Sequence, residues 1–440
     1  MQRRWWGGGG WLFLLMCGWA LWASAQTRVQ IDIEKSGSGV EQLGLAIPQM
    51  LGEGADPNLG QQIRGVLKQD LEITGFFRVA EQSTYPEALQ SVEQINYAAW
   101  AALNVVGVVA GRLSGSAEAQ MGLQLALHDV GQQRSLAGNT YNGPKLRHRE
   151  MAHRFSDLVF REFTGEPGPF DTQIICTSPG KSKNSKDIVI MDYDGYGART
   201  LISDGSLNLS PILSPNGTFL AYTSYRSGLP SLYMRNLLTG AEERLTSGQG
   251  LALAGAWSPD GRFLALNQTI DGNSEIFLYD TKSKQMKRLT NDWGIDVSPV
   301  FAPDGQRLAF VSDRGGSPQI YLTDIQGRTP VRLTYDGKYN TAPAWSPRGD
   351  TLAFVGRATG DRTLGIYTIH ADGSRFERLN EQGGSPEGPA WAPNGRFVMY
   401  TNTQGGSWRR YIMREDGQNF LLPASGPSCL VSQWVARTAR

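Results

Sequence analysis

The chain has few of the side chains that most catalytic and metal centres use. Its 440 residues include four histidines and three cysteines. No segment matches the G-x-S-x-G nucleophile motif or a phosphate-binding glycine loop. Charged residues make up only 19% and the formal net charge is +1. These deficits argue against a serine hydrolase and a nucleotide-binding enzyme, and the near-neutral charge argues against a nucleic-acid partner.

The spacing of the histidines does not indicate a metal site. His148 and His153 are five residues apart in a predicted helix, whereas two ligands on one helical face need a spacing of four. We therefore interpret this segment as a solvated, basic helix face. Recurrent Asp-Gly pairs, such as Asp271-Gly272, are explained by turn chemistry rather than calcium binding. We expect no metal and no cofactor.

Long apolar runs are missing beyond the N-terminus. Residues 11–22 form an apolar core shorter than the ~20 residues of a membrane span. Arg3 and Arg4 precede it, and small residues at 23–25 follow it. This pattern predicts a secretory signal peptide over residues 1–25, cleaved before Gln26. Its loss removes two arginines and changes the net charge from +1 to −1. We expect an exported protein that does not span a membrane.

Glycine and proline are abundant, and they mark a repeated unit. The chain has 53 glycines and 22 prolines. Similar turns recur about every 44 residues, and the three-residue sequence RLT closes three of the units, at 244–246, 288–290 and 332–334. A strand-rich repeat of this period indicates blades of a β-propeller. The turns are LSPNG (213–217), WSPDG (257–261), FAPDG (301–305), WSPRG (345–349) and WAPNG (391–395).

The ends of the repeat region predict how the ring closes. Segments 171–178, 187–195 and 198–203 match the last three strands of a blade that has no first strand. Segment 429–436 resembles that missing strand, so we predict that it completes the blade and closes a six-bladed propeller. The large residue before each turn should pack between neighbouring blades; these residues are Leu213, Trp257, Phe301, Trp345 and Trp391, with Trp434 as their equivalent in the last strand.

Two cysteines, Cys176 and Cys429, fall in this composite blade. Counting outward from the hairpin turn of the complete repeats places Cys176 opposite a position about three residues from Cys429. That separation is too large for a disulfide unless the strand register shifts. We expect unpaired buried thiols, with a disulfide in an oxidising compartment as the alternative.

Residues 26–168 have a different pattern and predict a small α/β domain. Alternating and apolar segments predict strands, and apolar residues at helical spacing predict helices. A Pro/Gly linker over 166–170 leads into the propeller, which we assign to residues 169–440. The fold class is therefore multidomain, with a six-bladed β-propeller after an α/β domain. The expected strands are 28–35, 42–50, 76–80, 105–113 and 120–130, and the expected helices are 58–75, 95–104 and 143–165.

The layout and several motifs resemble the TolB family, periplasmic propeller proteins of the Tol–Pal system of Gram-negative bacteria. The resemblance covers essentially all of the chain after the signal peptide. The most specific motif is the junction between the last predicted helix and the propeller. The motifs are LEITGFFRV (71–79), VVGVVAGRL (105–113), LRHREMAHRFSDLVFREFTGEPGPFDTQI (146–174) and DIVIMDYDGYGARTL (187–201), together with the repeated SPDG and RLT units.

The resemblance implies a non-enzymatic, monomeric adaptor in the periplasm. In this family the propeller binds Pal, the peptidoglycan-associated lipoprotein, at one mouth of its channel. The N-terminal segment of the mature protein engages TolA, and the two interactions are coupled. The resemblance further implies a role in outer-membrane integrity and in envelope constriction during cell division. Outer-membrane lipoproteins and colicins are additional expected partners.

Residue by residue, the resemblance assigns two sites. Leu251 departs from the family, in which a histidine is often found at this position of the Pal-binding mouth. The expected TolA-binding segment is Gln26, Thr27, Arg28, Val29, Gln30, Ile31, Asp32 and Ile33. The expected Pal-binding mouth comprises residues that lead into the innermost strands: Leu251, Ala254, Asp296, Val297, Ser298, Asn340 and Thr341.

Two other function classes are compatible with a propeller. One is a propeller enzyme, either peptidase-like or glycan-processing, and the other is a cell-wall-binding propeller without a Tol partner. An enzyme would need a Ser/His/Asp set or a carboxylate pair, which the repeats do not display. Binding to Pal distinguishes the adaptor from both alternatives.

Overall fold

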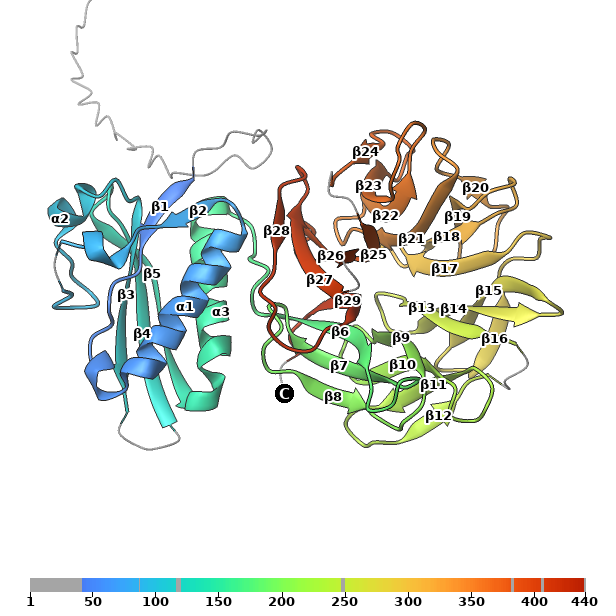
Figure 1. Cartoon of the computed structure of the whole chain (residues 1–440), viewed down its shortest axis with the longest axis horizontal. Coiled ribbons are helices and arrows are strands. Elements are labelled where there is room, and N and C mark those ends of the chain that lie inside the picture. Colours follow the sequence, from blue (N-terminus) through green and yellow to red (C-terminus); the bar gives the residue numbers. More distant parts are fainter. Residues whose placement is uncertain are drawn as a thin grey trace, which may run out of the picture.

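The computed structural model describes residues 42–438, except 87, 116–119, 247–249, 381–383 and 405–406. The predicted signal peptide and the expected strand 28–35 lie outside these residues. An N-terminal α/β domain and a ring of β-sheets lie side by side, and the last strand of the chain belongs to the ring (Figure 1). The predicted fold class is therefore confirmed.

The N-terminal domain contains one five-stranded sheet in the order β2-β1-β3-β4-β5. β1 pairs in parallel with β2 and β3, and β4 and β5 continue the sheet antiparallel. Helices α1 and α3 lie between this sheet and the propeller (Figure 1), and α2 packs on the opposite face. The strands are β1 (Leu43–Ala46), β2 (Phe77–Val79), β3 (Gly107–Ser114), β4 (Gln120–Asp129) and β5 (Arg134–Pro144). The helices are α1 (Pro57–Ile73), α2 (Tyr97–Ala101) and α3 (His148–Thr164), with 3₁₀ turns η2 (Glu53–Ala55), η3 (Gln82–Thr84) and η4 (Lys145–Arg147).

Strand β5 has no counterpart in the sequence-based prediction. It pairs only with β4, at the edge of the sheet, and most of its residues are exposed or half-buried. An exposed edge strand lacks the apolar alternation on which the prediction depends. For the same reason the predicted helix 143–165 is too long at its start, because β5 continues through Pro144 and α3 begins only at His148.

The propeller consists of six four-stranded sheets among the described residues. Five blades are continuous in sequence, and the sixth has the order β29-β6-β7-β8. The predicted closure by the last strand is thus confirmed. The composite blade contains β29 (Leu430–Ala436), β6 (Thr172–Pro179), β7 (Lys186–Asp192) and β8 (Arg199–Ile202). The next blades are β9 (Asn208–Leu213), β10 (Phe219–Ser224), β11 (Ser231–Asn236), β12 (Glu242–Arg244); and β13 (Ala252–Trp257), β14 (Phe263–Ile270), β15 (Asn273–Asp280), β16 (Gln285–Arg288). Then follow β17 (Asp296–Phe301), β18 (Arg307–Ser312), β19 (Gln319–Asp324), β20 (Val331–Arg332); β21 (Tyr339–Trp345), β22 (Thr351–Arg357), β23 (Gly365–His370), β24 (Glu377–Arg378); and β25 (Ser385–Trp391), β26 (Phe397–Gln404), β27 (Ser407–Arg414), β28 (Asn419–Leu421).

The RLT repeat fastens the outer part of each blade to its third strand. In the blade of β13–β16, the hydroxyl of Thr290 accepts a hydrogen bond from the backbone N–H of Ile276, at 2.9 Å. The guanidinium of Arg288 donates to the carbonyl of Thr290, at 2.7 Å. The same acceptor role is filled by Thr246, Thr334 and, in the variant repeat, the side-chain oxygen of Asn380. The motif is therefore structural in every blade that contains it.

The large residues before the turns pack between blades, as predicted. Trp257 belongs to a buried cluster with Ile212 and Leu232 of the preceding blade. The indole N–H of Trp391 donates to the carbonyl of Ala344 in its preceding blade, at 3.0 Å. Neighbouring sheets are therefore joined both by apolar packing and by hydrogen bonds.

Cys176 and Cys429 form a disulfide, with their Cα atoms 5.7 Å apart. The prediction of unpaired thiols is wrong, and the reason is a β-bulge in β29. Between Val431 and Gln433 the register shifts, so that two residues of β29 face one residue of β6. Cys176 therefore lies opposite Val431, two positions from Cys429, at a diagonal separation that a disulfide spans.

Candidate partner-binding mouth of the propeller

The six innermost strands all run in the same direction along the central channel. We call the end where they begin the inlet mouth and the end where they finish the outlet mouth. The connections from one blade to the next therefore lie at the inlet mouth, as do the loops between the second and third strands of each blade. The seven residues expected to bind Pal lie at or just inside this mouth, because they begin or precede β13, β17 and β21.

The channel itself encloses a cavity of about 450 Å³. Of the expected residues, Ala254 and Ser298 contribute to its lining. The pairing of each innermost strand with the second strand of its blade is interrupted by a register shift. Ser298 lies at this shift in β17, and its backbone φ angle is 54°. The outlet half of the cavity is lined by large aromatic side chains from the ends of the innermost strands, namely Trp257, Phe301, Trp345, Trp391 and Trp434.

Two of the expected contact residues are buried and hold the inlet loops in place. The carboxylate of Asp296 accepts a hydrogen bond from Arg314 Nη2 at 2.7 Å, and burial raises the pKa of this carboxyl. The Asn340 amide donates to Gln319 Oε1 at 2.8 Å and to the carbonyl of Asp336 at 2.9 Å. Both side chains therefore hold contacts within the protein, while Asp296 Oδ1 and Asn340 Oδ1 are buried without a hydrogen-bond partner among the described residues. Leu251, Val297 and Thr341 are half-buried.

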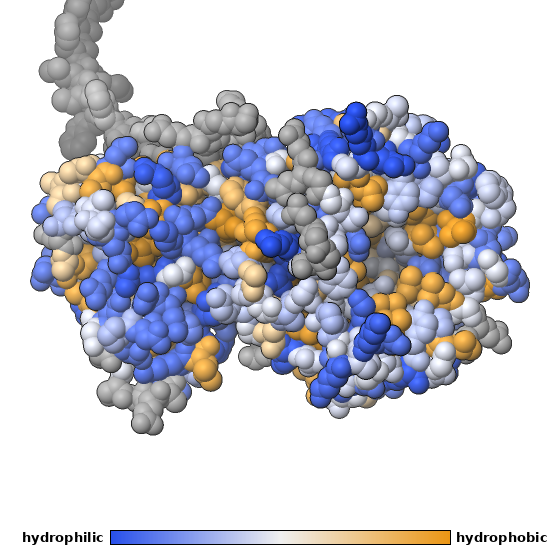
Figure 2. Space-filling model, in the orientation of Figure 1, coloured by the Kyte–Doolittle hydropathy of each residue, from blue (hydrophilic) through white to orange (hydrophobic). Residues whose placement is uncertain are grey.

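Four exposed aromatic or aliphatic residues of the inlet mouth lie shortly before the expected residues of β17 and β21, and sequence reasoning missed them. Trp293 is 74% exposed and Ile295 is 51% exposed, on the connection into β17. Tyr335 is 72% exposed on the next connection, and Tyr339 begins β21. The available signal was an aromatic residue in a connection where the other repeats have small or polar residues. On the face of the molecule that Figure 2 shows, residues of high hydropathy surround the hollow at the centre of the ring within a mostly hydrophilic surface.

A buried polar network joins the propeller to the N-terminal domain. Asp70 of α1 accepts hydrogen bonds from His153 Nδ1 of α3, at 2.9 Å, and from the hydroxyl of Tyr193 in the propeller, at 2.7 Å. Asp194 pairs with Arg149, and its Oδ2 lies 3.7 Å from His153 Nε2. The two carboxylates outweigh the effect of burial and raise the pKa of His153. The expected solvated helix face is thus wrong for His153, because its side of α3 packs against the propeller.

The same region contains a group of potential metal ligands among the described residues. Ligand atoms of His153, Asp192 and Asp194 lie within 4.8 Å of one another. However, Arg437 pairs with Asp192 at 2.7 Å and Arg149 pairs with Asp194. A divalent cation at this place would meet two guanidinium groups, so the charge of the carboxylates is already balanced.

The expected TolA-binding segment, Gln26–Ile33, lies outside the described residues. In the part of the chain that the structure describes, no helix is both long and apolar enough to cross a membrane.

Comparison with known proteins agrees with both parts of the fold. Residues 160–426 match the family model for the TolB beta propeller domain, and residues 29–136 match that for the TolB amino-terminal domain. A crystal structure of TolB from Acinetobacter baumannii is 29% identical, covers 91% of this chain and 98% of its own, and superimposes with a TM-score of 0.79.

Curated relatives named Tol-Pal system protein TolB show the same similarity. The protein of Paramagnetospirillum magneticum is 35% identical over 231 residues, which are 52% of this chain and 51% of the relative. That of Nitrosomonas europaea is 34% identical over 230 residues, 52% of each chain. The chain thus spans about half the length of the curated relatives it matches. Since the propeller model alone accounts for more than half of the sequence, the chain belongs to the TolB family.

Proposed function

We propose that the protein is a non-enzymatic adaptor of a Tol–Pal system in the periplasm. Residues 1–25 are a cleaved signal peptide, residues 26–168 form the N-terminal domain, and residues 169–440 form the propeller. The inlet mouth binds Pal, and Gln26–Ile33 engages TolA. Through these two interactions the protein supports outer-membrane integrity and envelope constriction during division.

The observation that carries the proposal is the exposed aromatic surface of the inlet mouth. Trp293, Ile295, Tyr335 and Tyr339 come from the connections into two neighbouring innermost strands. Tryptophan and tyrosine are enriched among residues that dominate the energy of protein interfaces. The buried contacts of Asp296 and Asn340 hold these connections in one arrangement. A prearranged surface loses less conformational entropy when a partner binds.

We expect Trp293→Ala and Tyr335→Ala each to weaken binding of Pal from the same organism by at least about thirtyfold, since an interface hot spot contributes ~2 kcal/mol or more. Isothermal titration calorimetry measures this loss. Leu238→Ala is the matched control, because Leu238 is 73% exposed but lies in the β11–β12 turn, at the outlet side of the propeller. Unchanged affinity in both aromatic variants, with the fold intact by circular dichroism, contradicts an inlet-mouth site.

We expect deletion of Gln26–Ile33 to abolish TolA binding while Pal binding persists. The segment precedes β1 by several residues in sequence, and the composition of Ser36–Gly39 is typical of a linker, so we expect its loss to leave the five described strands of the sheet in place. Surface plasmon resonance with each partner separates the two effects, and a variant with these residues in scrambled order is the control for length. Loss of both interactions means that the segment was assigned wrongly or that the protein has misfolded.

A further inference from the structure

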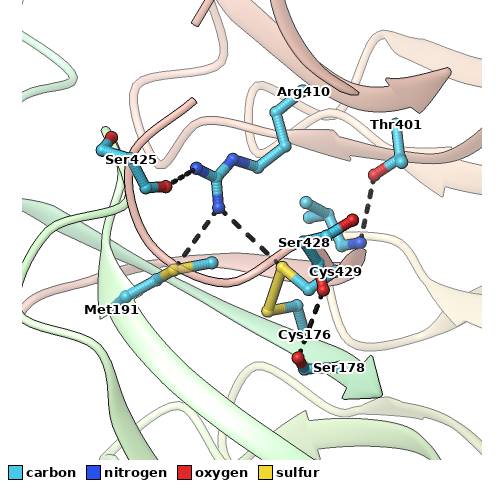
Figure 3. Close-up of a disulfide and its surroundings, with 9 residues drawn as sticks. Cys176, Ser178, Met191, Thr401, Arg410, Ser425, Ser428 and Cys429 are labelled. Atoms are coloured by element: carbon cyan, nitrogen blue, oxygen red, sulfur yellow. Dashed lines mark hydrogen bonds between the residues drawn. A yellow bond between two sulfur atoms is a disulfide. The ribbon is translucent and has the colours of Figure 1, made fainter. Parts of the chain in front are cut away.

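The disulfide Cys176–Cys429 lies beside a buried positive charge. Arg410 of β27 points toward the disulfide, with Nη1 3.9 Å from the sulfur of Cys429 and 3.4 Å from the sulfur of Met191 (Figure 3). Its Nη2 donates to the carbonyl of Ser425. No carboxylate of the described residues lies within ion-pairing distance of this guanidinium. Burial lowers the pKa of Arg410, although the charge of Asp194 opposes this effect.

An unpaired cation at this place favours the reduced form of the disulfide. In the oxidised protein the neutral sulfur offers the guanidinium only a weak acceptor. In the reduced protein a Cys429 thiolate would face Arg410 in a low-dielectric environment, which is the arrangement that lowers the pKa of a thiol. A reduced form that is stabilised in this way makes the disulfide a better oxidant.

The surroundings of Cys429 also offer a place for a reductant to approach. Cys429 follows an irregular segment, Leu422–Ser428, which we call the strap because it leads from the last complete blade to β29. A cavity of about 540 Å³ runs along the strap, and Cys429, Arg410 and Trp408 contribute to its walls. Cys429 is 1% exposed and is the cysteine that borders this cavity, whereas Cys176 of β6 is fully buried.

We propose that Cys176–Cys429 is a redox-active disulfide whose reductant is an external dithiol entering beside the strap. A thiolate of the dithiol attacks the Cys429 sulfur and forms a mixed disulfide. The Cys176–Cys429 bond breaks, and its electron pair leaves on Cys176, which takes a proton from solvent. The second thiol of the reductant then loses its proton and attacks the reductant sulfur of the mixed disulfide. Cys429 leaves as a thiolate paired with Arg410; the protein disulfide gains two electrons, and the dithiol becomes a disulfide.

The strap connects the disulfide to the domain interface, so reduction of the disulfide affects the hydrogen bonds at that interface. The hydroxyl of Ser425 donates to the backbone carbonyl of Asp194, and the carbonyl of Ser425 accepts from Arg410. The carboxylate of Asp194 in turn pairs with Arg149 of α3. A change of partner at Arg410 therefore acts on the contact that joins the propeller to the N-terminal domain.

The first test is the pKa of the Cys429 thiol. Cys176→Ser leaves Cys429 as the one thiol of a chain that lacks residues 1–25. The ultraviolet absorbance of the thiolate, followed against pH, should give a pKa at least one unit below the usual value of about 8.5. Adding Arg410→Met should raise it to that value or above, while Arg410→Lys should keep part of the shift. A pKa at or above about 8.5 with Arg410 present overturns the proposal.

The second test is the equilibrium of the protein disulfide with dithiothreitol. Near pH 8 we expect Arg410→Met to shift the equilibrium at least about threefold toward the disulfide, and near pH 6, where both thiols are protonated, the difference should vanish. Arg409→Met is the matched control, because Arg409 is the exposed neighbour on the same strand. Equal equilibrium constants for the Arg410→Met variant and the unaltered protein at both pH values mean that the disulfide is purely structural. If Arg410→Met does not fold, the thiol pKa with Arg410 present decides alone.

Discussion

Replacing both Cys176 and Cys429 by serine lowers the free energy of unfolding by about 2–5 kcal/mol. The disulfide joins residues separated by 253 positions, so its covalent loop contains nearly the whole propeller. In the chain-entropy account a cross-link stabilises by restricting the unfolded chain, and the effect grows with the length of the loop. The bulge in β29 brings the two cysteines to a separation that a disulfide accommodates, so the folded strands keep their pairing.

Urea denaturation followed by tryptophan fluorescence measures this change. Dithiothreitol should lower the midpoint of the unaltered protein to that of the double serine variant, and it should leave the variant unaffected. A double variant that unfolds at the same urea concentration as the oxidised protein would show that the loop makes no net contribution. Near pH 6, where both thiols of the reduced protein are protonated, no Cys429 thiolate pairs with Arg410, so the comparison made at that pH is separate from the redox proposal.

Asp70→Ala is the second change for which we expect a large effect, about 3–5 kcal/mol in the free energy of unfolding. Asp70 is fully buried and is the acceptor for His153 and for the Tyr193 hydroxyl. Its removal leaves a buried imidazolium and a buried hydroxyl without this partner. Because the pKa of His153 is raised, the stabilisation is fully present below the usual histidine pKa of about 6.5 and is lost as pH rises through the raised value.

The measurement is therefore made near pH 6, below the raised pKa of His153. Gln61→Ala is the matched control, since Gln61 is exposed on the same helix α1. Tyr193→Phe removes the hydrogen bond from the propeller side, and a double-mutant cycle with Asp70→Ala isolates the coupling between the domains. Strict additivity in that cycle contradicts an energetic link through Asp70.

The repeat was predictable because the same local chemistry occurs in every blade. Turn residues such as Gly261, and the caps formed by Thr290 and its equivalents, make their hydrogen bonds within a blade. Their spacing along the chain therefore reports their spacing in the structure. The missing first strand of the composite blade could be located for the same reason. Segment 429–436 has the sequence pattern of a first strand, although it lies far along the chain from the other strands of that blade.

Features that depend on contacts between elements were not predictable in the same way. A single extra residue in β29 decides whether Cys176 meets Cys429, and nothing in the local sequence marks that bulge. His153 lies in a polar stretch of α3, yet it is buried because Asp70 and Tyr193 meet it from α1 and the propeller. At the inlet mouth, repeat position led to the connections into the innermost strands, but it did not reveal burial: Asp296 and Asn340 are buried, whereas Trp293 is exposed.

The order of strands in the composite blade has a consequence for biogenesis. β6 is the first propeller strand to be synthesised, and its partner β29 follows about 250 residues later. One edge of β6 stays unpaired until the final residues of the chain, which form β29, are in place. Pairing so distant in sequence is slow, and an open strand edge attracts other chains. The last residues of the chain therefore do two things at once: they complete a blade and they cover the one propeller edge that was open from the start.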